Sequence, residues 1–166
     1  MRRSDEDDYR EYVTARLGAL RRTAYLICHD WDLADDLVSI ALGKLYRSWG
    51  RARQVERLDA YVHRILVNVW QDELRRTARR GPAYGPVDDQ RPAPDGPDVV
   101  ERLTQLELLR RLPPRQRAAV VLRFYDDLSI QETAAALGCS EGTIKSLSSR
   151  GLRALRGLAD QTEGQS

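Results

Sequence analysis

The hydrophobic positions in the C-terminal third of the chain repeat at helical spacing in two adjacent segments. The first segment carries Ile130, Ala134, Ala135 and Leu137, and Gly138 follows where a left-handed residue ends a helix. Ser140 is a natural N-cap for the second segment. One face of that segment carries Ile144, Ser148, Gly151, Leu152 and Leu155. This spacing predicts a helix-turn-helix.

The second of these helices has a polar face that we expect to point away from the core. The residues of that face, with those that flank it, are Glu141, Thr143, Lys145, Ser146, Leu147, Ser149 and Arg150. Short hydrogen-bonding side chains with one lysine and one arginine suit a helix in the major groove of DNA, its amino end near a phosphate. The alternative is an ordinary helical hairpin with a solvated polar face. The Gly-Cys-Ser turn and the small residues of the first helix favour DNA binding.

The first half of the chain predicts three more helices, because apolar residues recur every three or four positions in each. Ser4, followed by four acidic residues, is the expected N-cap of the first helix, and Asp32 is that of the second. Ile40 lies on the outer face of the second helix, where it marks either a partner surface or a lone exposed side chain. The predicted helices span residues 4–28, 32–49 and 58–80, and a basic loop covers residues 48–57.

Residues 81–98 interrupt the helical pattern. This segment has five prolines and three glycines among eighteen residues, a composition that favours neither a helix nor a packed strand. One arginine against four aspartates gives it a net charge of −3. That charge suits a solvated tether, a segment in a positively charged channel, or a mimic of nucleic acid. Beyond it we expect helices over residues 99–112 and 115–125, with Pro114 in the first turn of the latter and Tyr125 in its core.

The predicted fold class is therefore all-α, with two small helical bundles joined by a flexible linker rich in Pro, Gly and Asp. A chain of 166 residues with 42% hydrophobic and 7% aromatic content fits small helix bundles. The expected domains are residues 1–80 and 99–160, with the linker at residues 81–98 and the helix-turn-helix last.

The charge of the chain is nearly balanced, since 27 basic and 25 acidic residues leave a net charge of +2. Nucleic-acid binding would therefore depend on local basic clusters. Residues 57–80 contain six arginines and three acids, and four of these arginines, residues 75, 76, 79 and 80, end the segment. Arginines there either stabilise the helix dipole or bind phosphate, and both can hold at once.

The two cysteines, Cys28 and Cys139, lie far apart, without metal-ligand spacing or paired histidines. We expect small buried residues in a reducing cytosol, with no disulfide and no metal site. No apolar run of about 18 residues is present, and the first three residues precede acids instead of an apolar signal core. We expect no membrane insertion, no secretion and a cytoplasmic location.

Three strings of the chain together resemble one protein family. Residues 112–156, LPPRQRAAVVLRFYDDLSIQETAAALGCSEGTIKSLSSRGLRALR, are similar to region 4 of an extracytoplasmic-function (ECF) sigma factor, a two-domain specificity subunit of bacterial RNA polymerase. Residues 31–49, WDLADDLVSIALGKLYRSW, resemble region 2.2, and residues 59–76, DAYVHRILVNVWQDELRR, resemble regions 2.3 and 2.4. The match covers nearly the whole chain in the right order, and it is most similar to the compact SigE-like group of actinobacteria.

The resemblance implies a protein that binds core RNA polymerase, directs promoter recognition and nucleates transcription initiation. The N-terminal domain would bind the clamp helices through Asp36, Ser39, Ile40 and Gly43. The loop at residues 48–58 would capture a flipped base of the minus-ten element. The implied minus-ten residues are Arg51, Arg53, Asn68, Asp72, Arg75 and Arg76. The implied minus-thirty-five residues are Glu141, Thr143, Lys145, Ser146, Leu147, Ser149 and Arg150.

The implied partners are the clamp helices and flap of core RNA polymerase and promoter DNA, and an anti-sigma factor is a further partner that the family allows. The resemblance implies no enzyme, no catalytic residue, no cofactor and no metal. Three departures from the family pattern stand out. Ser39 and Ile40 stand where family members commonly have Gln followed by an acidic residue. Leu147 stands where an Arg or Gln that hydrogen-bonds to a base is common, and Ser148 stands where a larger core residue is frequent. Leu147 can contact a thymine methyl but cannot hydrogen-bond to a base.

Two other function classes are compatible with parts of the sequence. A stand-alone helix-turn-helix regulator would bind duplex DNA without polymerase, but the helices similar to region 2 argue against it. A nuclease or recombinase would need clustered metal-binding carboxylates or a placed nucleophile. The adjacent Asp35 and Asp36 are better explained as part of the surface that contacts the clamp.

Overall fold

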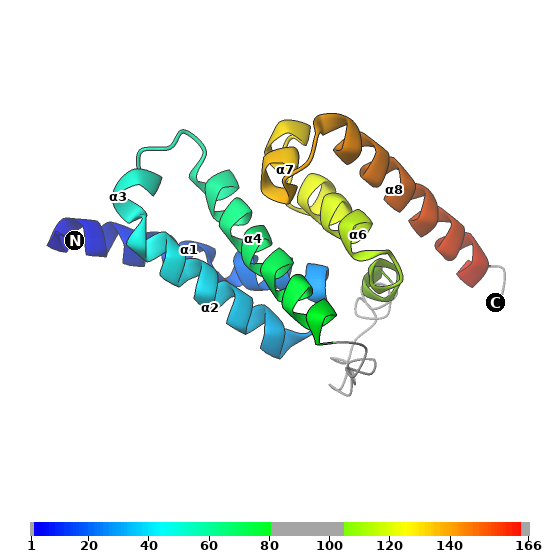
Figure 1. Ribbon diagram of the computed structural model, residues 1–166, viewed down its shortest axis with the longest axis horizontal. Helices are drawn as coiled ribbons and strands as arrows, with labels where there is room; N and C mark the ends of the chain where they lie inside the picture. The colour runs from blue at the N-terminus through cyan, green and yellow to red at the C-terminus, as the bar shows by residue number, and fades with distance from the viewer. Residues whose placement is uncertain (1, 81–104, 164–166) are drawn as a thin grey trace.

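The computed structural model describes residues 2–80 and 105–163, and all regular structure within those residues is helical. The N-terminal bundle consists of α1 (Arg3–Cys28), α2 (Trp31–Arg47), the short α3 (Trp49–Ala52) and α4 (Leu58–Arg79). The C-terminal bundle consists of a helix at residues 105–110, α6 (Pro114–Val120), the π-helix η1 (Val121–Tyr125), α7 (Ile130–Leu137) and α8 (Glu141–Glu163). Figure 1 shows the two bundles side by side. The predicted all-α fold of two bundles is confirmed.

The junction between α1 and α2 is determined by two residues that follow the first helix. His29 adopts a left-handed conformation (φ 57°) and its backbone N–H donates to the carbonyl of Tyr25 at 2.7 Å, which ends α1. The carboxylate of Asp30 then accepts hydrogen bonds from the backbone N–H groups of Asp32 (2.9 Å) and Leu33 (3.2 Å). Asp30 is therefore the N-cap of α2, and the prediction of Asp32 was wrong because the helix begins two residues earlier than a cap at Asp32 would place it.

Two other predicted boundaries in the N-terminal bundle were wrong. Ser4 is not an N-cap, because α1 already begins at Arg3 and the residue before it makes no side-chain cap hydrogen bond. Residues 48–57 are not entirely loop, because they include α3. Trp49 and Ala52 of α3 are 3% and 0% exposed, so burial of these apolar side chains anchors the segment to the core and favours the helical turn.

The helix-turn-helix prediction is confirmed in its local details. The hydroxyl of Ser129 accepts from the backbone N–H of Glu132, and the carboxylate of Glu132 accepts from the N–H of Ser129, a capping box that starts α7. Gly138 ends α7 with a φ of 70°, which glycine adopts without strain. The hydroxyl of Ser140 accepts from the backbone N–H of Thr143 at 3.1 Å and caps α8 as predicted.

The expected helix over residues 115–125 changes its winding halfway. After α6, the N–H of Asp126 donates to the carbonyl of Val121 five residues earlier at 3.1 Å, which closes the π-helix. The wider winding turns Tyr125 outward, so the prediction that it lies in the core was wrong: it is 46% exposed. Ala135 of α7 is also exposed, because its neighbour in sequence occupies the buried position instead.

The two bundles pack against each other. Helix α4 contacts α7, and α1 contacts both α6 and η1; Figure 1 shows α4 beside the C-terminal bundle. Buried side chains of the two bundles, such as Leu20 and Trp70 in the first and Leu122 and Leu128 in the second, belong to one hydrophobic cluster. The sequence indicated two separate bundles and gave no relative placement, so this packing is a new feature.

Candidate nucleic-acid interface

The first three turns of α8 carry the side chains predicted to read DNA. Five of the seven predicted residues are exposed: Glu141, Lys145, Ser146, Ser149 and Arg150. They share one solvent-facing surface of the helix, because the opposite surface is occupied by Ile144, which is 0% exposed. The recognition surface of α8, as we call these five residues, therefore presents hydrogen-bonding groups of both charges.

The other two predicted readers on α8 are only partly accessible. Thr143 is half-buried, and its hydroxyl lies 2.9 Å from that of Ser140 in the cap. Leu147 is half-buried and packs against the core cluster. The expectation that Leu147 points fully away from the core was wrong. This apolar side chain lies at the edge of the helix's buried face, so part of it packs against the core and part is accessible to solvent.

The inner face of α8 lies unusually close to α6. Ser148 is buried, and its hydroxyl donates to the carbonyl of Ile144 at 2.7 Å, so the small polar side chain is satisfied within its own helix. At Gly151 an added Cβ would lie 2.5 Å from Cγ2 of Val120 and 3.4 Å from the carbonyl oxygen of Gln116. Glycine is required here by this close approach of α6, which holds α8 in place.

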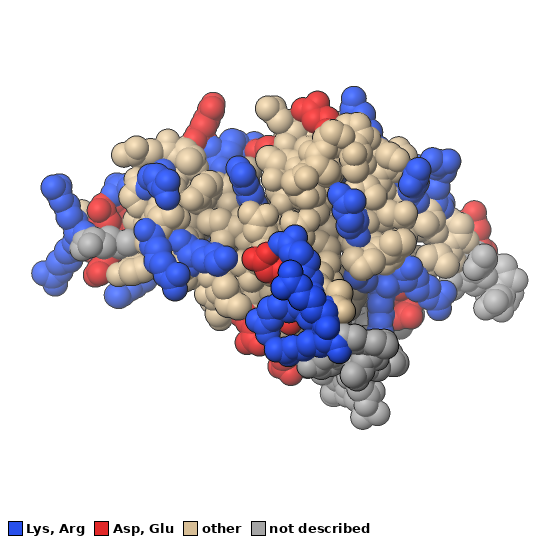
Figure 2. Space-filling model, in the orientation of Figure 1, with Lys and Arg blue, Asp and Glu red and all other residues tan. Residues whose placement is uncertain are grey.

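One face of α4 is exposed along nearly its whole length. Asn68, Asp72, Arg75 and Arg76, all predicted from the sequence, lie on it with Arg64 and Arg79. Two ion pairs form within the helix, between Arg75 and Asp72 and between Arg76 and Glu73, the latter at 3.7 Å. Figure 2 shows the basic side chains gathered over the C-terminal end of α4. This concentration of arginine is the local basic cluster that phosphate binding needs.

The segment after α2 contains two further arginines predicted to bind DNA, and their environments differ. Arg51 is exposed on α3. Arg53 forms ion pairs with Asp5 and Asp8 of α1, the second at 3.0 Å between Nη2 and Oδ2. The acidic start of α1, which the sequence assigned to the helix dipole, therefore also holds Arg53 beside α1.

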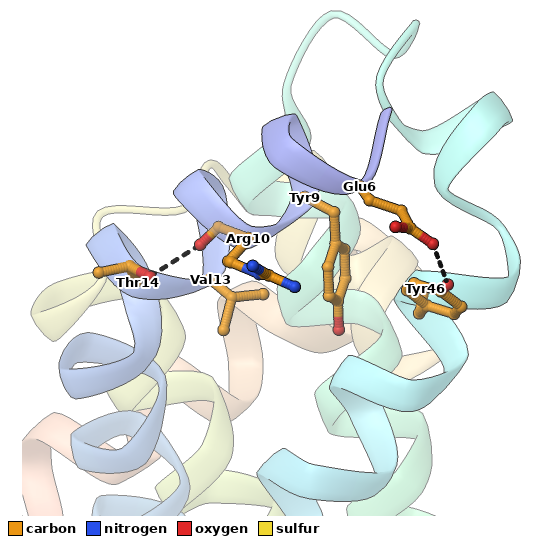
Figure 3. A pocket seen from close by; sticks show the side chains of 6 residues that line it. All are labelled: Glu6, Tyr9, Arg10, Val13, Thr14 and Tyr46. Atoms are coloured by element: carbon orange, nitrogen blue, oxygen red, sulfur yellow. Dashed lines mark hydrogen bonds between the residues drawn. The ribbon is translucent and has the colours of Figure 1, made fainter. Parts of the chain in front are cut away.

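The outward face of α2 carries the predicted polymerase contacts. Asp36, Ser39 and Ile40 are exposed, Ile40 to 49%, and Gly43 has open space where a Cβ would stand. Next to α2, a surface hollow of about 240 Å³ lies between α1 and the end of α2 (Figure 3). Tyr46, 40% exposed, contributes to the wall of that hollow. Exposed apolar and small residues in one place are typical of a protein-binding surface.

Three polar residues meet where the bundles pack, and we call them the Asp126 cluster: Thr23 of α1, His63 of α4 and Asp126 after η1. The hydroxyl of Thr23 donates to the Asp126 carboxylate, whose oxygens lie 2.9 and 3.0 Å away. Nε2 of His63 lies 3.4 Å from Oδ2 of the same carboxylate. The side chains of His63 and Asp126 are only 14% and 17% exposed.

The protonation of His63 follows from its two neighbours. Its Nδ1 lies 2.6 Å from the backbone carbonyl of Asp59, which can only accept, so Nδ1 carries a proton. Burial by itself lowers the pKa of His63, but the hydrogen bond and charge of Asp126, together with Asp59, outweigh burial and raise the pKa above its ordinary value. A positive charge on His63 is therefore favoured when the bundles are packed.

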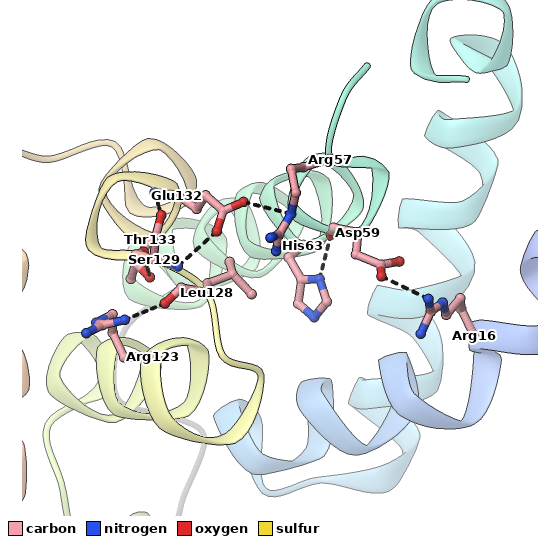
Figure 4. Close-up of polar contacts among 9 residues, drawn as sticks. All are labelled: Arg16, Arg57, Asp59, His63, Arg123, Leu128, Ser129, Glu132 and Thr133. Carbon is pink, nitrogen blue, oxygen red and sulfur yellow. Dashed lines mark hydrogen bonds and ion pairs between the residues drawn. The ribbon is translucent and has the colours of Figure 1, made fainter. Parts of the chain in front are cut away.

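Two more polar contacts join α4 and the residues before it to α7. The amide of Gln71 donates to the carbonyl of Leu137 at 3.1 Å. Nε of Arg57 lies 3.3 Å from Oε2 of Glu132 (Figure 4). Sequence patterns did not identify these residues or the Asp126 cluster as a group, because their partners lie far away along the chain. The one local signal is Thr23, a polar residue that is 2% exposed on the buried face of α1.

The described residues contain no group of three or more His, Cys, Asp or Glu side chains arranged to hold a metal ion. Across residues 2–80 and 105–163, no helix has the length and apolar character needed to cross a membrane. Cys28 and Cys139 are both free and half-buried. Burial raises the pKa of the Cys28 thiol to about 11, which keeps it protonated at neutral pH.

A helix-turn-helix with exposed hydrogen-bonding residues on its second helix defines a DNA-binding protein of the helix-turn-helix class. The family model described as Sigma-70 region 2 matches residues 12–80, and that of Sigma-70 region 4 matches residues 106–155. The RNA polymerase sigma-E factor of Streptomyces coelicolor is 36% identical over 154 residues, which are 90% of this chain and 84% of that protein. The ECF RNA polymerase sigma factor SigM of Mycobacterium tuberculosis is 37% identical over 132 residues, 79% of this chain and 66% of that protein.

A solved structure is also similar over nearly the whole chain. It is the sigma factor RpoE of Bartonella quintana in complex with the anti-sigma factor NepR, with a TM-score of 0.80 and 26% identity, covering 92% of this chain and 97% of that one. The protein belongs to the ECF sigma factors of the sigma-70 family. It binds core RNA polymerase and directs promoter recognition and transcription initiation.

Proposed function

We propose that the two bundles divide the work of promoter recognition. In this proposal residues 1–80 form a domain that binds the polymerase clamp helices and the minus-ten element. Residues 99–160 form a domain that binds the flap and reads the minus-thirty-five element, and residues 81–98 link the two. The observation that carries the proposal is the placement of two separate exposed faces, one on α4 and one on α8, each on its own bundle.

The proposed minus-ten surface is the exposed face of α4 together with α3. Its members are Arg51, Arg53, Asn68, Asp72, Arg75 and Arg76. The arginines supply phosphate contacts, and Asn68 has the amide that can pair with a base edge. Because Arg53 is paired with two aspartates of α1, its contact with DNA would require exchange of those partners for a phosphate. Arg51 forms no ion pair with any other residue that the structure describes, so it is the stronger of these two candidates for a DNA contact.

The proposed polymerase surface is the α2 face with Asp36, Ser39, Ile40 and Gly43. Ile40 gives this surface an apolar centre, and Asp36 gives it one negative charge at the edge. The proposed minus-thirty-five contacts are the recognition surface of α8, with additional contacts from Thr143 and the accessible part of Leu147. Arg150 is the residue of this surface best suited to bidentate recognition of guanine.

We further propose that the protein acts in the cytoplasm, has no catalytic activity of its own, and is regulated by an anti-sigma factor. Support for the regulator comes from the similar structure, in which a sigma factor is in complex with an anti-sigma factor. The alternative of a stand-alone helix-turn-helix regulator is not favoured, because the region 2 match covers residues 12–80, which such a regulator would not need.

Run-off transcription with purified core polymerase, followed by mapping of the start sites, tests this proposal. On a mapped promoter, Arg150→Ala should weaken binding of the holoenzyme by about 1–3 kcal/mol, and the loss should depend on one base position. Arg156→Ala is the matched control, since it removes an exposed arginine about 9 Å further along α8. Equal loss for both variants on all sequences would show a general phosphate contact. Failure of the protein to direct core enzyme to any start site would refute the proposed function.

A further inference from the structure

The packed arrangement of the bundles limits how far apart their DNA-binding faces can be. Gln71 and Leu137 are joined by a hydrogen bond of 3.1 Å. Arg75 follows Gln71 by four residues of α4, and Arg150 follows Leu137 by a turn and ten residues of α8. With ~1.5 Å per helical residue and at most ~3.8 Å per residue of turn, Arg75 and Arg150 cannot be more than about 45 Å apart.

The promoter requires a larger separation. The minus-ten and minus-thirty-five elements are centred about 25 base pairs apart, which corresponds to about 85 Å of duplex at ~3.4 Å per base pair. The packed chain therefore cannot place α4 on one element and α8 on the other. If the bundles act as proposed above, the contact between them has to open before both elements are bound.

The contact between the bundles is polar at its edge. The carboxylate of Asp126 has little exposure to water, and its two partners, Thr23 and His63, both belong to the other bundle. Opening exposes the carboxylate to solvent, and closing removes it again. This desolvation costs free energy unless a positive charge or hydrogen-bond donors compensate for the lost water. The Asp126 cluster supplies that compensation, and its positive charge exists only when Nε2 of His63 carries a proton.

We propose that the packed arrangement is a closed resting state of this sigma factor, and that the Asp126 cluster holds it closed in a proton-dependent manner. This inference rests on the proposed two-site function. With His63 neutral, its Nδ1 keeps the proton that it donates to Asp59, and the lone pair of Nε2 faces the Asp126 carboxylate. Protonation of Nε2 converts this repulsive pair into an ion pair across the two bundles.

Other charged groups near His63 are already paired. The Asp59 carboxylate binds the guanidinium of Arg16 at 3.1 Å and accepts a hydrogen bond from the hydroxyl of Tyr12 at 2.8 Å. On α7, Glu132 pairs with Arg57. Figure 4 shows His63 among these pairs, with Asp59 on its own helix and Glu132 on the facing one. Asp126 is therefore the carboxylate whose charge depends most directly on His63.

The sign of the pH effect follows from the raised pKa of His63 in the closed state. The open state exposes His63, whose pKa then returns toward about 6.5. Closing takes up a proton, so the cluster stabilises the closed state fully below about pH 6.5 and loses this contribution as the pH rises through the raised pKa. For each unit of pKa difference between the two states, the ratio of closed to open molecules changes by about tenfold.

The test uses the full chain at about pH 7 and about pH 8.5, with small-angle X-ray scattering for its dimensions and proton NMR for its two histidines. In the wild type, the radius of gyration should increase with pH, and His63 should titrate above the ordinary value of about 6.5. In Asp126→Asn, which keeps an acceptor for Thr23 but has no charge, the pKa of His63 should fall and the chain should be more open at pH 7.

Asp127→Asn is the matched control. Asp127 is exposed, adjacent in sequence, and has a φ of 55°, a conformation that asparagine adopts readily. This variant should behave like the wild type. His63→Gln, which cannot titrate, should give the same dimensions at both pH values. If the dimensions of the wild type are independent of pH, or if Asp126→Asn retains the same pH dependence, the proposal is overturned.

The rate of association with core polymerase tests whether the closed state slows holoenzyme formation. At about pH 7, Asp126→Asn should form holoenzyme faster than the wild type, and Asp127→Asn should not. An equal rate for Asp126→Asn and the wild type would overturn the resting-state role. Run-off transcription distinguishes this failure from that of the proposed function: absence of any start site with every variant would refute promoter recognition itself, whatever the scattering shows.

Discussion

Replacement of Gly151 by alanine should show how much the close packing of α8 against α6 affects stability, as distinct from the helix propensity of the residue. The added Cβ would lie 2.5 Å from Cγ2 of Val120 and 3.4 Å from the backbone oxygen of Gln116. Val120 is 1% exposed and β-branched, so its methyl group cannot rotate away freely. Relief of the contact therefore requires α8 to move away from α6, a shift that would also displace the recognition surface.

Two opposing effects determine the magnitude. Overpacking of a filled core costs about 1–3 kcal/mol, whereas alanine is favoured over glycine within a helix by about 1 kcal/mol. We expect a net loss of about 0–2 kcal/mol for Gly151→Ala. Gly157→Ala on the same helix is the matched control, because nothing lies within 4 Å of its added Cβ. It should gain about 0.5–1 kcal/mol from propensity alone.

Urea unfolding followed by far-ultraviolet circular dichroism measures both variants. The two free energies of unfolding should differ by about 0.5–3 kcal/mol. In a chain of this size each kcal/mol corresponds to about 2–4 °C in Tm. A second substitution, Val120→Ala, should cost less in the Gly151→Ala background than in the wild type, because it removes the clashing methyl group. If Gly151→Ala is stabilised as much as Gly157→Ala, the close approach of α6 and α8 is refuted.

Two further predictions concern the junction of α1 and α2. Asp30→Ala should lower the free energy of unfolding by about 0.5–2 kcal/mol, because two backbone N–H groups lose their acceptor; Asp32→Ala, measured in the same urea titration, should cost less, and an equal loss would contradict Asp30 as the cap. Burial, followed by the charges of Arg117 and Arg110, lowers the pKa of His29 to about 4, so the folded chain should lose on the order of 3 kcal/mol as the pH falls from about 6.5 to 4. His29→Asn, which tolerates the same left-handed φ, should remove this loss in urea titrations across that range, and an unchanged acid sensitivity would contradict the assignment.

Hydrophobic spacing and capping chemistry predicted much of the local structure. The ends of α7 and α8 follow from Gly138 and Ser140, which act on neighbouring backbone groups. Errors of one or two residues, as at Asp32, occur where two acids close together in the sequence offer the same capping chemistry and only the backbone decides between them. The π-helix could not be predicted, because its winding depends on the packing of η1 against α1 and α6.

The packing of the two bundles depends on contacts that no local pattern contains. Thr23 and Asp126 are 103 positions apart, and Gln71 and Leu137 are 66 apart. Asp126 and Gln71 have the character of ordinary polar residues, and Leu137 takes part only through its backbone carbonyl. Most of each candidate DNA-binding face lies within one helix, α4 or α8, and could therefore be found from sequence. The surface that joins the bundles instead combines residues from five elements, α1, α4, α6, η1 and α7.

The two histidines respond to closure in opposite directions, and together they limit its pH range. His63 gains an ion-pair partner from the C-terminal bundle, so closing favours its protonated form. His29 is 6% exposed, and the arginines that disfavour its protonation, Arg110 and Arg117, also belong to that bundle. Closing therefore adds the charges of these arginines to the effect of burial, which already lowers the pKa of His29, and it favours a proton on His63. The arginines near His29 therefore weaken the contact as the pH falls toward the pKa of His29, and loss of the His63 proton weakens it as the pH rises.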